Sequence, residues 1–299
     1  MFAPKELSLG KITQKMTLSQ WHRKYIADLA SLYPQCEAEG LFYRTVEYLW
    51  GLNRLHYSLQ KDRILSPEES EKILWIFREL SDGRPLQYIT GVQPFFGRDF
   101  LVDPRVLIPR GETEELVALV LSAYGKEPLR LLDVGTGSGT IAVTLAVERP
   151  GWQVTAVDIS PDALEVAATN AKNLGVAVNF VQADILDESR WVEQGVYQVI
   201  VSNPPYVRES EKKAMHTNVL DHEPPGALFV PDADPLVFYR AIARFAKGAL
   251  ASGGRLYFEI NEALGQETTA LLEGLGFEEV KIHRDINGRD RMVEAQKND

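Results

Sequence analysis

The chain has 299 residues, of which 45% are hydrophobic and 25% charged, and its 42 acidic and 32 basic side chains give a formal net charge of −10 at pH 7. This composition is typical of a folded globular protein, and the length allows two domains. The acidic balance disfavours stable binding to nucleic acid, which needs basic side chains to replace the counterions of the phosphates.

The same overall features predict a cytoplasmic protein. No stretch approaches the ~18 consecutive apolar residues that a membrane-spanning helix needs. The first residues carry no signal-like pattern. Cys36 is the single cysteine, so an internal disulfide is excluded. We therefore expect no membrane association.

The first 82 residues are predicted to form a small helical bundle. From residue 18 onwards hydrophobic side chains recur at spacings of three and four, as Trp21, Tyr25 and Leu29 illustrate. This period is typical of amphipathic helices. The segment contains no cluster of catalytic residue types, so binding is the task expected of it.

Residues 83–108 are predicted to form a β-hairpin that links two domains. Gly83-Arg84-Pro85 interrupts the helical pattern, and the stretch from Leu86 to Ile108 is rich in aromatic, glycine and β-branched residues. Such a composition favours strands joined by a turn. Its aromatic side chains are expected in the core of the hairpin.

Residues 109–299 are predicted to form an α/β domain, because short apolar strands alternate with helical segments from Leu129 onwards. Such alternation is typical of a doubly wound, mostly parallel sheet with helices on both faces. Strands are expected near residues 129–134, 154–157, 177–181, 196–201, 255–260, 280–283 and 291–295. Helices are expected near residues 115–121, 141–147, 236–250 and 262–275.

A glycine-rich loop follows the first of these strands, which ends in Asp133. Glycine stands at alternate positions, with Thr136 and Ser138 between Gly135, Gly137 and Gly139. A nicotinamide-binding loop would need glycine or alanine three residues after the second glycine, and the chain has threonine there. The spacing suits a ligand with an amino acid moiety better, and Asp133 is expected to meet its ammonium group directly or through water.

Two further strand ends carry acidic residues. Asp158, followed by Ile159, ends the second strand, where a carboxylate can accept bonds from both hydroxyls of a ribose. The alternative role of Asp158 is to cap the helix that begins at Pro161. Asp184 and Ile185 follow the third strand and are placed to meet an adenine. Strand, glycine loop and strand-end acid in this order resemble the class I S-adenosylmethionine-dependent methyltransferases.

The fourth strand runs into Asn203-Pro204-Pro205-Tyr206. The prolines have no N–H to donate and stiffen the segment, so that it presents acceptors only. The Asn203 side-chain oxygen and the Pro204 carbonyl would take both N–H groups of a planar amide or aryl NH2. Such bonds would hold the nitrogen lone pair in line with a sulfonium methyl group. Pro205 and Tyr206 would line the substrate pocket, and the proton lost after transfer would go to water or the Pro204 carbonyl.

Further motifs carry a closer resemblance. They are Gly83-Arg84-Pro85-Leu86-Gln87-Tyr88-Ile89-Thr90-Gly91, Leu107-Ile108-Pro109-Arg110-Gly111-Glu112-Thr113-Glu114, Glu223-Pro224 with Ala227-Leu228, and Arg284-Asp285 with Gly288 and Asp290-Arg291. From about residue 18 to its end, the chain is similar to the peptide chain release factor glutamine methyltransferases. Two residues depart from the pattern: Gly111 stands where the family often has proline, and Ile185 where some members have an aromatic residue.

This resemblance implies N5-methylation of the glutamine in the Gly-Gly-Gln motif of class 1 release factors, with S-adenosylmethionine as cofactor and no metal. It also implies that the N-terminal bundle binds the release factor. One alternative is an enzyme that methylates an amino group of a DNA or RNA base; another is a sensor that binds S-adenosylmethionine without chemistry. For Arg110, Thr113 and Glu114 a structural role is as well supported as a role in the site.

Overall fold

The computed structural model describes residues 15–188 and 196–298 and divides into two units, Met1–Thr90 and Gly91–Asp299. The predicted linker therefore contributes residues to both units. Within the described residues, no helix is long and apolar enough to cross a membrane.

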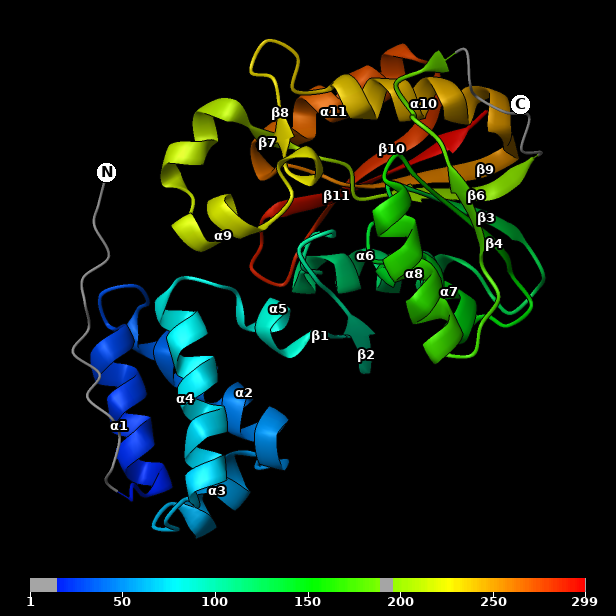
Figure 1. Ribbon diagram of the computed structural model, residues 1–299. Coiled ribbons are helices and arrows are strands. Elements are labelled where there is room, and N and C mark those ends of the chain that lie inside the picture. The colour runs from blue at the N-terminus through cyan, green and yellow to red at the C-terminus, as the bar shows by residue number, and fades with distance from the viewer. Residues whose placement is uncertain (1–14, 189–195, 299) are drawn as a thin grey trace. The chain divides into compact units, whose positions relative to one another are not determined.

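The N-terminal unit is helical, as predicted (Figure 1). Thr17 and Ser66 begin two of its helices with reciprocal side-chain to backbone hydrogen bonds, which satisfy the first N–H groups of a helix. Trp21, Tyr25 and Phe77 pack edge to face or tilted in its buried core. Its helices are α1 (Leu18–Leu29), α2 (Gln35–Trp50), α3 (Arg54–Gln60), α4 (Pro67–Ser81) and α5 (Leu86–Thr90).

Helix α5 corrects the prediction that the hairpin begins at Leu86. The N–H groups of Tyr88 and Ile89 both donate to the Pro85 carbonyl, which starts a helical turn. Leu86 and Ile89 are buried with the apolar residues of the bundle. The turn was missed because tyrosine and isoleucine favour strands and the segment is too short to show a helical period.

The hairpin itself comprises β1 (Val92–Phe95) and β2 (Arg98–Leu101), paired antiparallel. Phe96 and Gly97 form its turn with φ of 49° and 73°, as a two-residue turn between strands requires. The Asn170 side chain accepts from the N–H of Leu101 at 2.7 Å and donates to its carbonyl at 3.0 Å. These contacts attach the hairpin to helix α8 (Pro161–Asn173) within the C-terminal unit.

The C-terminal unit is built on a mostly parallel sheet, as predicted. Within the described residues this sheet has seven strands in the order β10-β11-β9-β6-β3-β4-β5, with β10 and β11 antiparallel. Its strands are β3 (Arg130–Val134), β4 (Gln153–Asp158), β5 (Asn179–Gln182), β6 (Tyr197–Ser202), β9 (Leu250–Glu259), β10 (Phe277–Arg284) and β11 (Asp290–Lys297).

Helices cover both faces of this sheet (Figure 1). One apolar core lies under α6 (Gly111–Ala123), α7 (Thr140–Glu148) and α8 (Pro161–Asn173). The other lies under α10 (Val237–Ala249) and α11 (Gly265–Gly274). The middle residues of the central strands are apolar, because both faces of the sheet are covered there: Leu131 and Leu132 in β3, and Val199, Ile200 and Val201 in β6.

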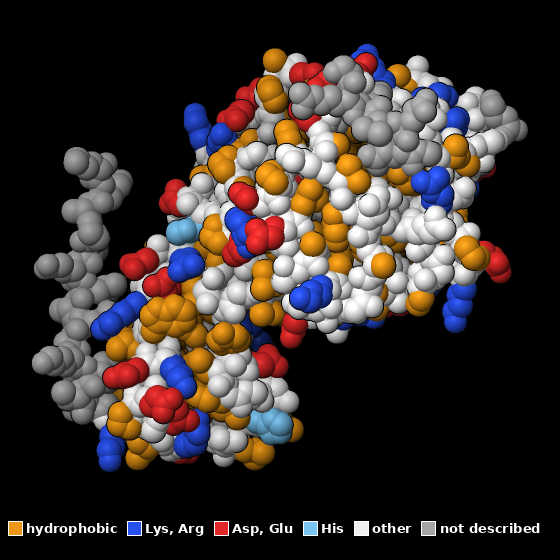
Figure 2. Space-filling view, turned by 45° about the vertical axis from the view of Figure 1, so that its right-hand side comes forward, with side chains coloured by type: hydrophobic (Ala, Val, Ile, Leu, Met, Phe, Trp, Pro, Cys, Tyr) orange, Lys and Arg blue, Asp and Glu red, His pale blue; other side chains and the backbone are white. Residues whose placement is uncertain are grey.

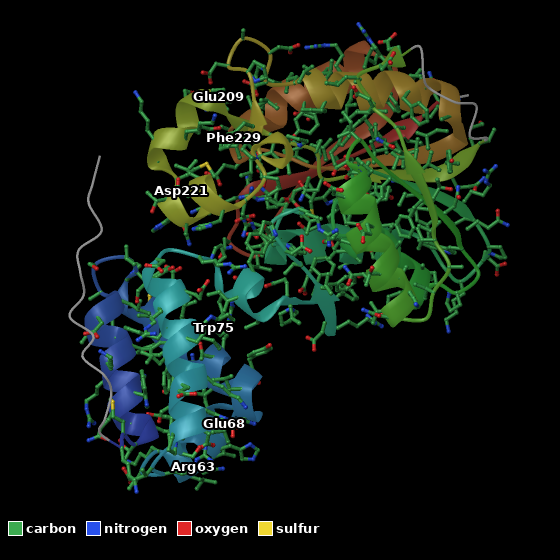
Figure 3. All side chains as sticks on the ribbon, viewed as in Figure 1. Arg63, Glu68, Trp75, Glu209, Asp221 and Phe229 are labelled. Carbon is green, nitrogen blue, oxygen red and sulfur yellow. The ribbon has the colours of Figure 1, made fainter. Side chains whose placement is uncertain are left out.

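A polar insertion follows β6 at the carboxyl edge of the sheet. It contains β7 (Val207–Arg208), α9 (Thr217–His222) and β8 (Phe229–Val230), and β7 pairs with β8. The Lys212 ammonium lies 4.2 Å from the centre of the Phe229 ring, which Figure 3 labels. The insertion brings the segment after Glu223 back towards the strand ends.

Candidate active site

A cavity of about 410 Å³ lies at the carboxyl ends of the parallel strands. Ligands bind at this edge in open α/β sheets, where the strand order reverses. Nine of the residues singled out in the sequence line it, namely Gly135, Gly137, Asp158, Ile159, Asp184, Ile185, Asn203, Pro204 and Pro205. The other five candidate residues, Asp133, Thr136, Ser138, Gly139 and Tyr206, are not among the residues that line it.

Glycine is needed at the three positions of the loop for different structural reasons. All three have φ between 54° and 81°, where residues with a Cβ are strained. A Cβ at Gly135 or Gly137 would meet no atom within 4 Å, so these glycines keep the cavity open. A Cβ at Gly139 would lie 2.9 Å from the Cβ of Ala167, so Gly139 permits close packing of α7 on α8.

Asp133 braces the glycine loop from beneath. Its Oδ2 atom accepts from the Thr136 hydroxyl at 2.6 Å and from the Ala142 N–H at 3.2 Å. Burial raises the pKa of this carboxyl to about 7. Among the described residues, its Oδ1 atom is buried without a hydrogen-bond partner. A buried acceptor of this kind fits a donor supplied by a ligand, directly or through a bridging water.

Asp158 is held in place by backbone donors and faces the cavity. Its Oδ2 accepts from the Gly137 N–H at 2.8 Å and its Oδ1 from the Ser160 N–H at 2.9 Å. The helix α8 is capped by the Ser160 hydroxyl, which accepts from the Ala163 N–H. Asp158 therefore does not cap the helix with its side chain, and each carboxylate oxygen retains a lone pair for a ligand hydroxyl.

Apolar side chains flank Asp158 on the cavity wall. Ile159 is 61% exposed, and Ile185 packs against the second core of the unit. Asp184 accepts the N–H of Leu186 at 2.9 Å, which shapes the loop after β5. A carboxylate beside two aliphatic side chains suits a nucleoside, whose sugar is polar and whose base has apolar faces.

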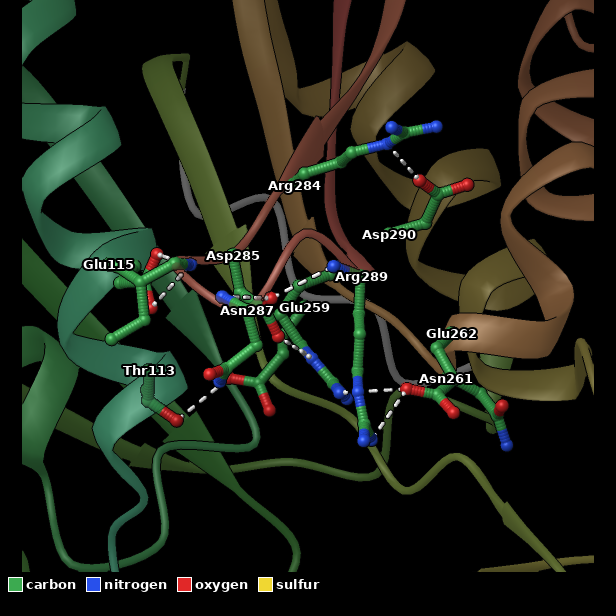
Figure 4. Close-up of polar contacts among 12 residues, drawn as sticks. Thr113, Glu115, Glu259, Asn261, Glu262, Arg284, Asp285, Asn287, Arg289 and Asp290 are labelled. Atoms are coloured by element: carbon green, nitrogen blue, oxygen red, sulfur yellow. Dashed lines mark hydrogen bonds and ion pairs between the residues drawn. The ribbon is translucent and has the colours of Figure 1, made fainter.

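Asn203 is tied to two residues from distant parts of the chain. Its Nδ2 donates to the Thr113 hydroxyl at 3.2 Å, and that hydroxyl donates to the Glu259 carboxylate at 2.7 Å. The Tyr206 hydroxyl donates to the other oxygen of Glu259 at 3.1 Å. Tyr206 is thus tied to the same carboxylate as Thr113, and it is not among the residues that line the cavity. Figure 4 shows Thr113 on α6 beside Glu259 at the end of β9.

Sequence reasoning missed Glu259. Its side chain is buried, and burial raises its pKa while the bonds from Thr113 and Tyr206 oppose that rise. The available signal was an acidic residue closing an otherwise apolar strand, Leu256-Tyr257-Phe258, at the same sheet edge as Asn203.

Glu223 joins two of the motifs at the rim of the cavity. It accepts from the Arg110 guanidinium at 2.6 Å and from the Ile108 N–H at 3.1 Å. Three residues that follow it, Pro224, Gly226 and Ala227, line the cavity. Arg110 therefore has a structural role, which is one of the two possibilities left open by the sequence, although it bonds the insertion and not the sheet.

The fold and this site define a class I methyltransferase. A family model described as the methyltransferase small domain matches residues 113–228. A methyltransferase from Pyrococcus furiosus is similar in structure, with a TM-score of 0.51 and 18% identity over 69% of this chain and 91% of that chain. A 16S rRNA methyltransferase from T. thermophilus, solved with AdoMet and guanosine, has a TM-score of 0.50 at 20% identity, over 69% of this chain and 50% of that chain.

The sequence relatives are more specific. A model described as the PrmC N-terminal domain matches residues 19–91. The release factor glutamine methyltransferase of Flavobacterium psychrophilum is 40% identical over 94% of this chain and 99% of its own length. That of Bacteroides thetaiotaomicron is 43% identical over 90% and 96%. The chain belongs to the release factor glutamine methyltransferase family, which confirms the resemblance of its motifs.

Proposed function

We propose that the protein transfers the methyl group of S-adenosylmethionine to the side-chain amide nitrogen of the glutamine in the Gly-Gly-Gln motif of class 1 peptide chain release factors. The observation that carries this proposal is the orientation of Asn203. Its Nδ2 donates to Thr113, so its Oδ1 is turned to the other side of the amide. With the Pro204 carbonyl, this oxygen offers two acceptors to a substrate NH2.

The cavity residues fit the cofactor. Asp158 would accept from the ribose hydroxyls, and Ile159 and Ile185 would pack on the base, with Asp184 near its amino group. The unpartnered Oδ1 of Asp133 would accept from the ammonium group, directly or through water. When bound, S-adenosylmethionine supplies a methyl group on a positively charged sulfur that departs as a neutral thioether.

The chain's own contribution to the reaction is orientation. An amide nitrogen is a weak nucleophile because its lone pair is delocalised into the carbonyl. Two hydrogen bonds from its N–H groups to Asn203 Oδ1 and the Pro204 carbonyl would fix the plane of the amide. Positioning of this kind contributes several kcal/mol, and up to ~7–11 in ideal cases. Pro204 and Pro205 have no N–H that could compete for these acceptors.

We further propose that the N-terminal unit binds the release factor. Among the described residues of this unit, six large hydrophobic side chains are exposed, namely Leu32, Tyr48, Leu55, Leu59, Ile64 and Trp75. Figure 3 labels Trp75 on α4, and Figure 2 shows hydrophobic side chains at the surface of this unit. Apolar side chains that gather at one surface, as Figure 2 shows for this unit, are typical of protein interaction sites. The net charge of −10 favours a protein partner with basic surface over nucleic acid.

The test uses the purified full chain with labelled S-adenosylmethionine and a class 1 release factor. The same factor with the Gln→Ala change in its tripeptide motif, duplex DNA and ribosomal RNA are tested beside it. We expect label only in the intact factor, abolished by Asn203→Ala and retained by Asn173→Ala at an exposed position of α8. Label in nucleic acid with an unlabelled factor would instead assign the protein to the base methyltransferases.

A further inference from the structure

We propose that Glu259 is a positioning residue that acts through the Thr113 hydroxyl to hold the Asn203 side-chain oxygen towards the substrate amide. The inference rests on the proposed function, because the proposed function makes the substrate amide the partner of the Asn203 side-chain oxygen. It adds a part of the machinery that lies behind the cavity wall and touches neither substrate nor cofactor.

The three residues meet because of sheet register and helix placement. Asn203 directly follows β6 and Glu259 is the last residue of β9, and in this parallel pair Ser202 lies opposite Phe258. Asn203 and Glu259 therefore leave the sheet at the same level. Thr113 comes from the first turn of α6. Its hydroxyl lies 2.7 Å from the Glu259 carboxylate and 3.2 Å from the Asn203 nitrogen.

The direction of this chain of hydrogen bonds follows from the chemistry of its members. An ionised carboxylate accepts only, and a hydroxyl has one hydrogen to donate. The Thr113 hydrogen goes to Glu259, so the hydroxyl oxygen is left to accept, and the Asn203 NH2 group is the donor that meets it. The Asn203 oxygen must then point away from Thr113. A protonated Glu259 would donate to the hydroxyl instead, which would let Thr113 donate to Asn203 and allow the amide to turn over.

Groups from several elements face Glu259 and decide how readily its side chain ionises. Burial raises the pKa of Glu259 most, and Glu112 on α6 adds to this rise, whereas the hydrogen bond from Thr113 on α6 opposes it. Arg291 on β11 favours the ionised form, and its own side chain is only 12% exposed. The Tyr206 hydroxyl donates to the second carboxylate oxygen, and the Tyr239 hydroxyl on α10 donates to the backbone carbonyl.

Burying a carboxylate is costly unless its oxygens are bonded. Both oxygens of Glu259 are bonded here, one to Thr113 and one to Tyr206. If these hydrogen bonds served only to hold α6 against β9, they would not need to extend to Asn203. The arrangement is explained if the fixed direction of the bonds is what the site requires.

The test compares Thr113→Val, which keeps the shape and removes the hydroxyl, with Thr113→Ser, which retains it. Thr269→Val on α11 is the matched control, since the hydroxyl of that threonine donates to the carbonyl of Gly265 in its own helix. We expect Thr113→Val to lower kcat about tenfold or more, with little change in KM for the factor. Thr113→Ser should stay within about threefold of wild type, and cofactor affinity by calorimetry should be unchanged in all three.

The pH profile separates positioning from simple packing. Wild type should lose kcat on the acid side as Glu259 becomes protonated. Glu259→Gln should have low kcat at every pH and lack this acid limb. The proposal is overturned if Thr113→Val keeps full kcat. It is also overturned if Thr113→Val loses no more kcat than Thr269→Val does for the same fall in melting temperature.

A second readout does not depend on turnover. In protein labelled with 15N-asparagine, the Asn203 side-chain NH2 signal is assigned by its loss in Asn203→Asp. It should shift in Thr113→Val and titrate with pH in wild type but not in Glu259→Gln. An Asn203 signal that neither shifts in Thr113→Val nor titrates with pH in wild type would refute the proposal. A wild type that leaves the release factor unlabelled would defeat the proposed function, while this spectrum would still decide the role of Glu259.

Discussion

Removing either partner of the Arg110–Glu223 pair should loosen the cavity wall that follows Glu223. The Glu223 side chain is 1% exposed, whereas that of Arg110 is 36% exposed. Among the described residues, Arg110→Ala would leave the buried Glu223 carboxylate with the Ile108 N–H as its one remaining donor. Fully buried pairs lose about 3–5 kcal/mol in such a change, and water access at Arg110 reduces the expected loss to about 2 kcal/mol.

Glu223→Ala should cost about as much by a different route. Arg110 can turn to solvent, but the buried Ile108 N–H would lose its acceptor, at about 1–3 kcal/mol. The double variant should then be little worse than either single one, with a coupling energy of about 1–2 kcal/mol.

The assay is a double-mutant cycle by urea denaturation, with cofactor affinity measured by calorimetry on the same four proteins. Affinity should fall in all three variants, since Pro224, Gly226 and Ala227 line the cavity. Costs that add within about 0.5 kcal/mol would refute the reasoning, because independent sites behave in this way. Unchanged affinity in destabilised variants would show that the pair holds the fold and not the wall.

Four further predictions concern the strand ends and the glycine loop. Asp158→Asn should weaken cofactor binding about 10- to 150-fold in calorimetry, the equivalent of ~1.5–3 kcal/mol for bonds to a charged acceptor. Gly139→Ala should lower stability by about 2–4 kcal/mol in denaturation, because of its φ of 81° and the contact of 2.9 Å with Ala167. Gly137→Ala should lower stability less and cofactor affinity more. Burial raises the pKa of Asp133 from 3.8 to about 7, so the folded state binds a proton there that the unfolded state has lost. The stability that this proton contributes is present below pH 4 and disappears as pH rises through 7, so melting temperature should depend less on pH in Asp133→Asn than in wild type; an equal slope would contradict this.

The cofactor side of the site could be predicted because its signals are local. The glycine loop, Asp158 and Asp184 each end a short apolar run, and the carboxyl ends of parallel strands meet at one edge. Alternation of strands and helices was enough for the fold class, which the sheet order and the relatives confirm. The role of Gly139 depends on which helix packs against its loop, and nothing near it in the sequence identifies Ala167.

The prediction of secondary structure failed where tertiary contacts decide which structure forms. Residues 86–90 form a helix because Leu86 and Ile89 are buried with the bundle, although Tyr88 and Ile89 favour strands. A segment of this length has no period that could distinguish the two structures. The bonding partners of Glu223 and Glu259 were not predicted for a related reason: Glu259 bonds a residue 146 positions away, and Glu223 bonds residues 113 and 115 positions away.

These long-range bonds explain the segment Leu107–Glu114 as a junction of three parts of the unit. Arg110 donates to Glu223 on the insertion after β6, and Thr113 donates to Glu259 at the end of β9. Glu114 accepts from the N–H of Phe96 in the hairpin turn at 3.0 Å. Each of these three contacts joins an N–H or O–H group, which donates, to a carboxylate, which accepts. The direction of each hydrogen bond is therefore fixed. A proline at Gly111 would keep all three, because the Gly111 N–H begins helix α6 and is not needed within it. Gly111→Pro should therefore leave kcat and melting temperature close to wild type, and a loss of either would show that this backbone position carries a role that its contacts do not reveal.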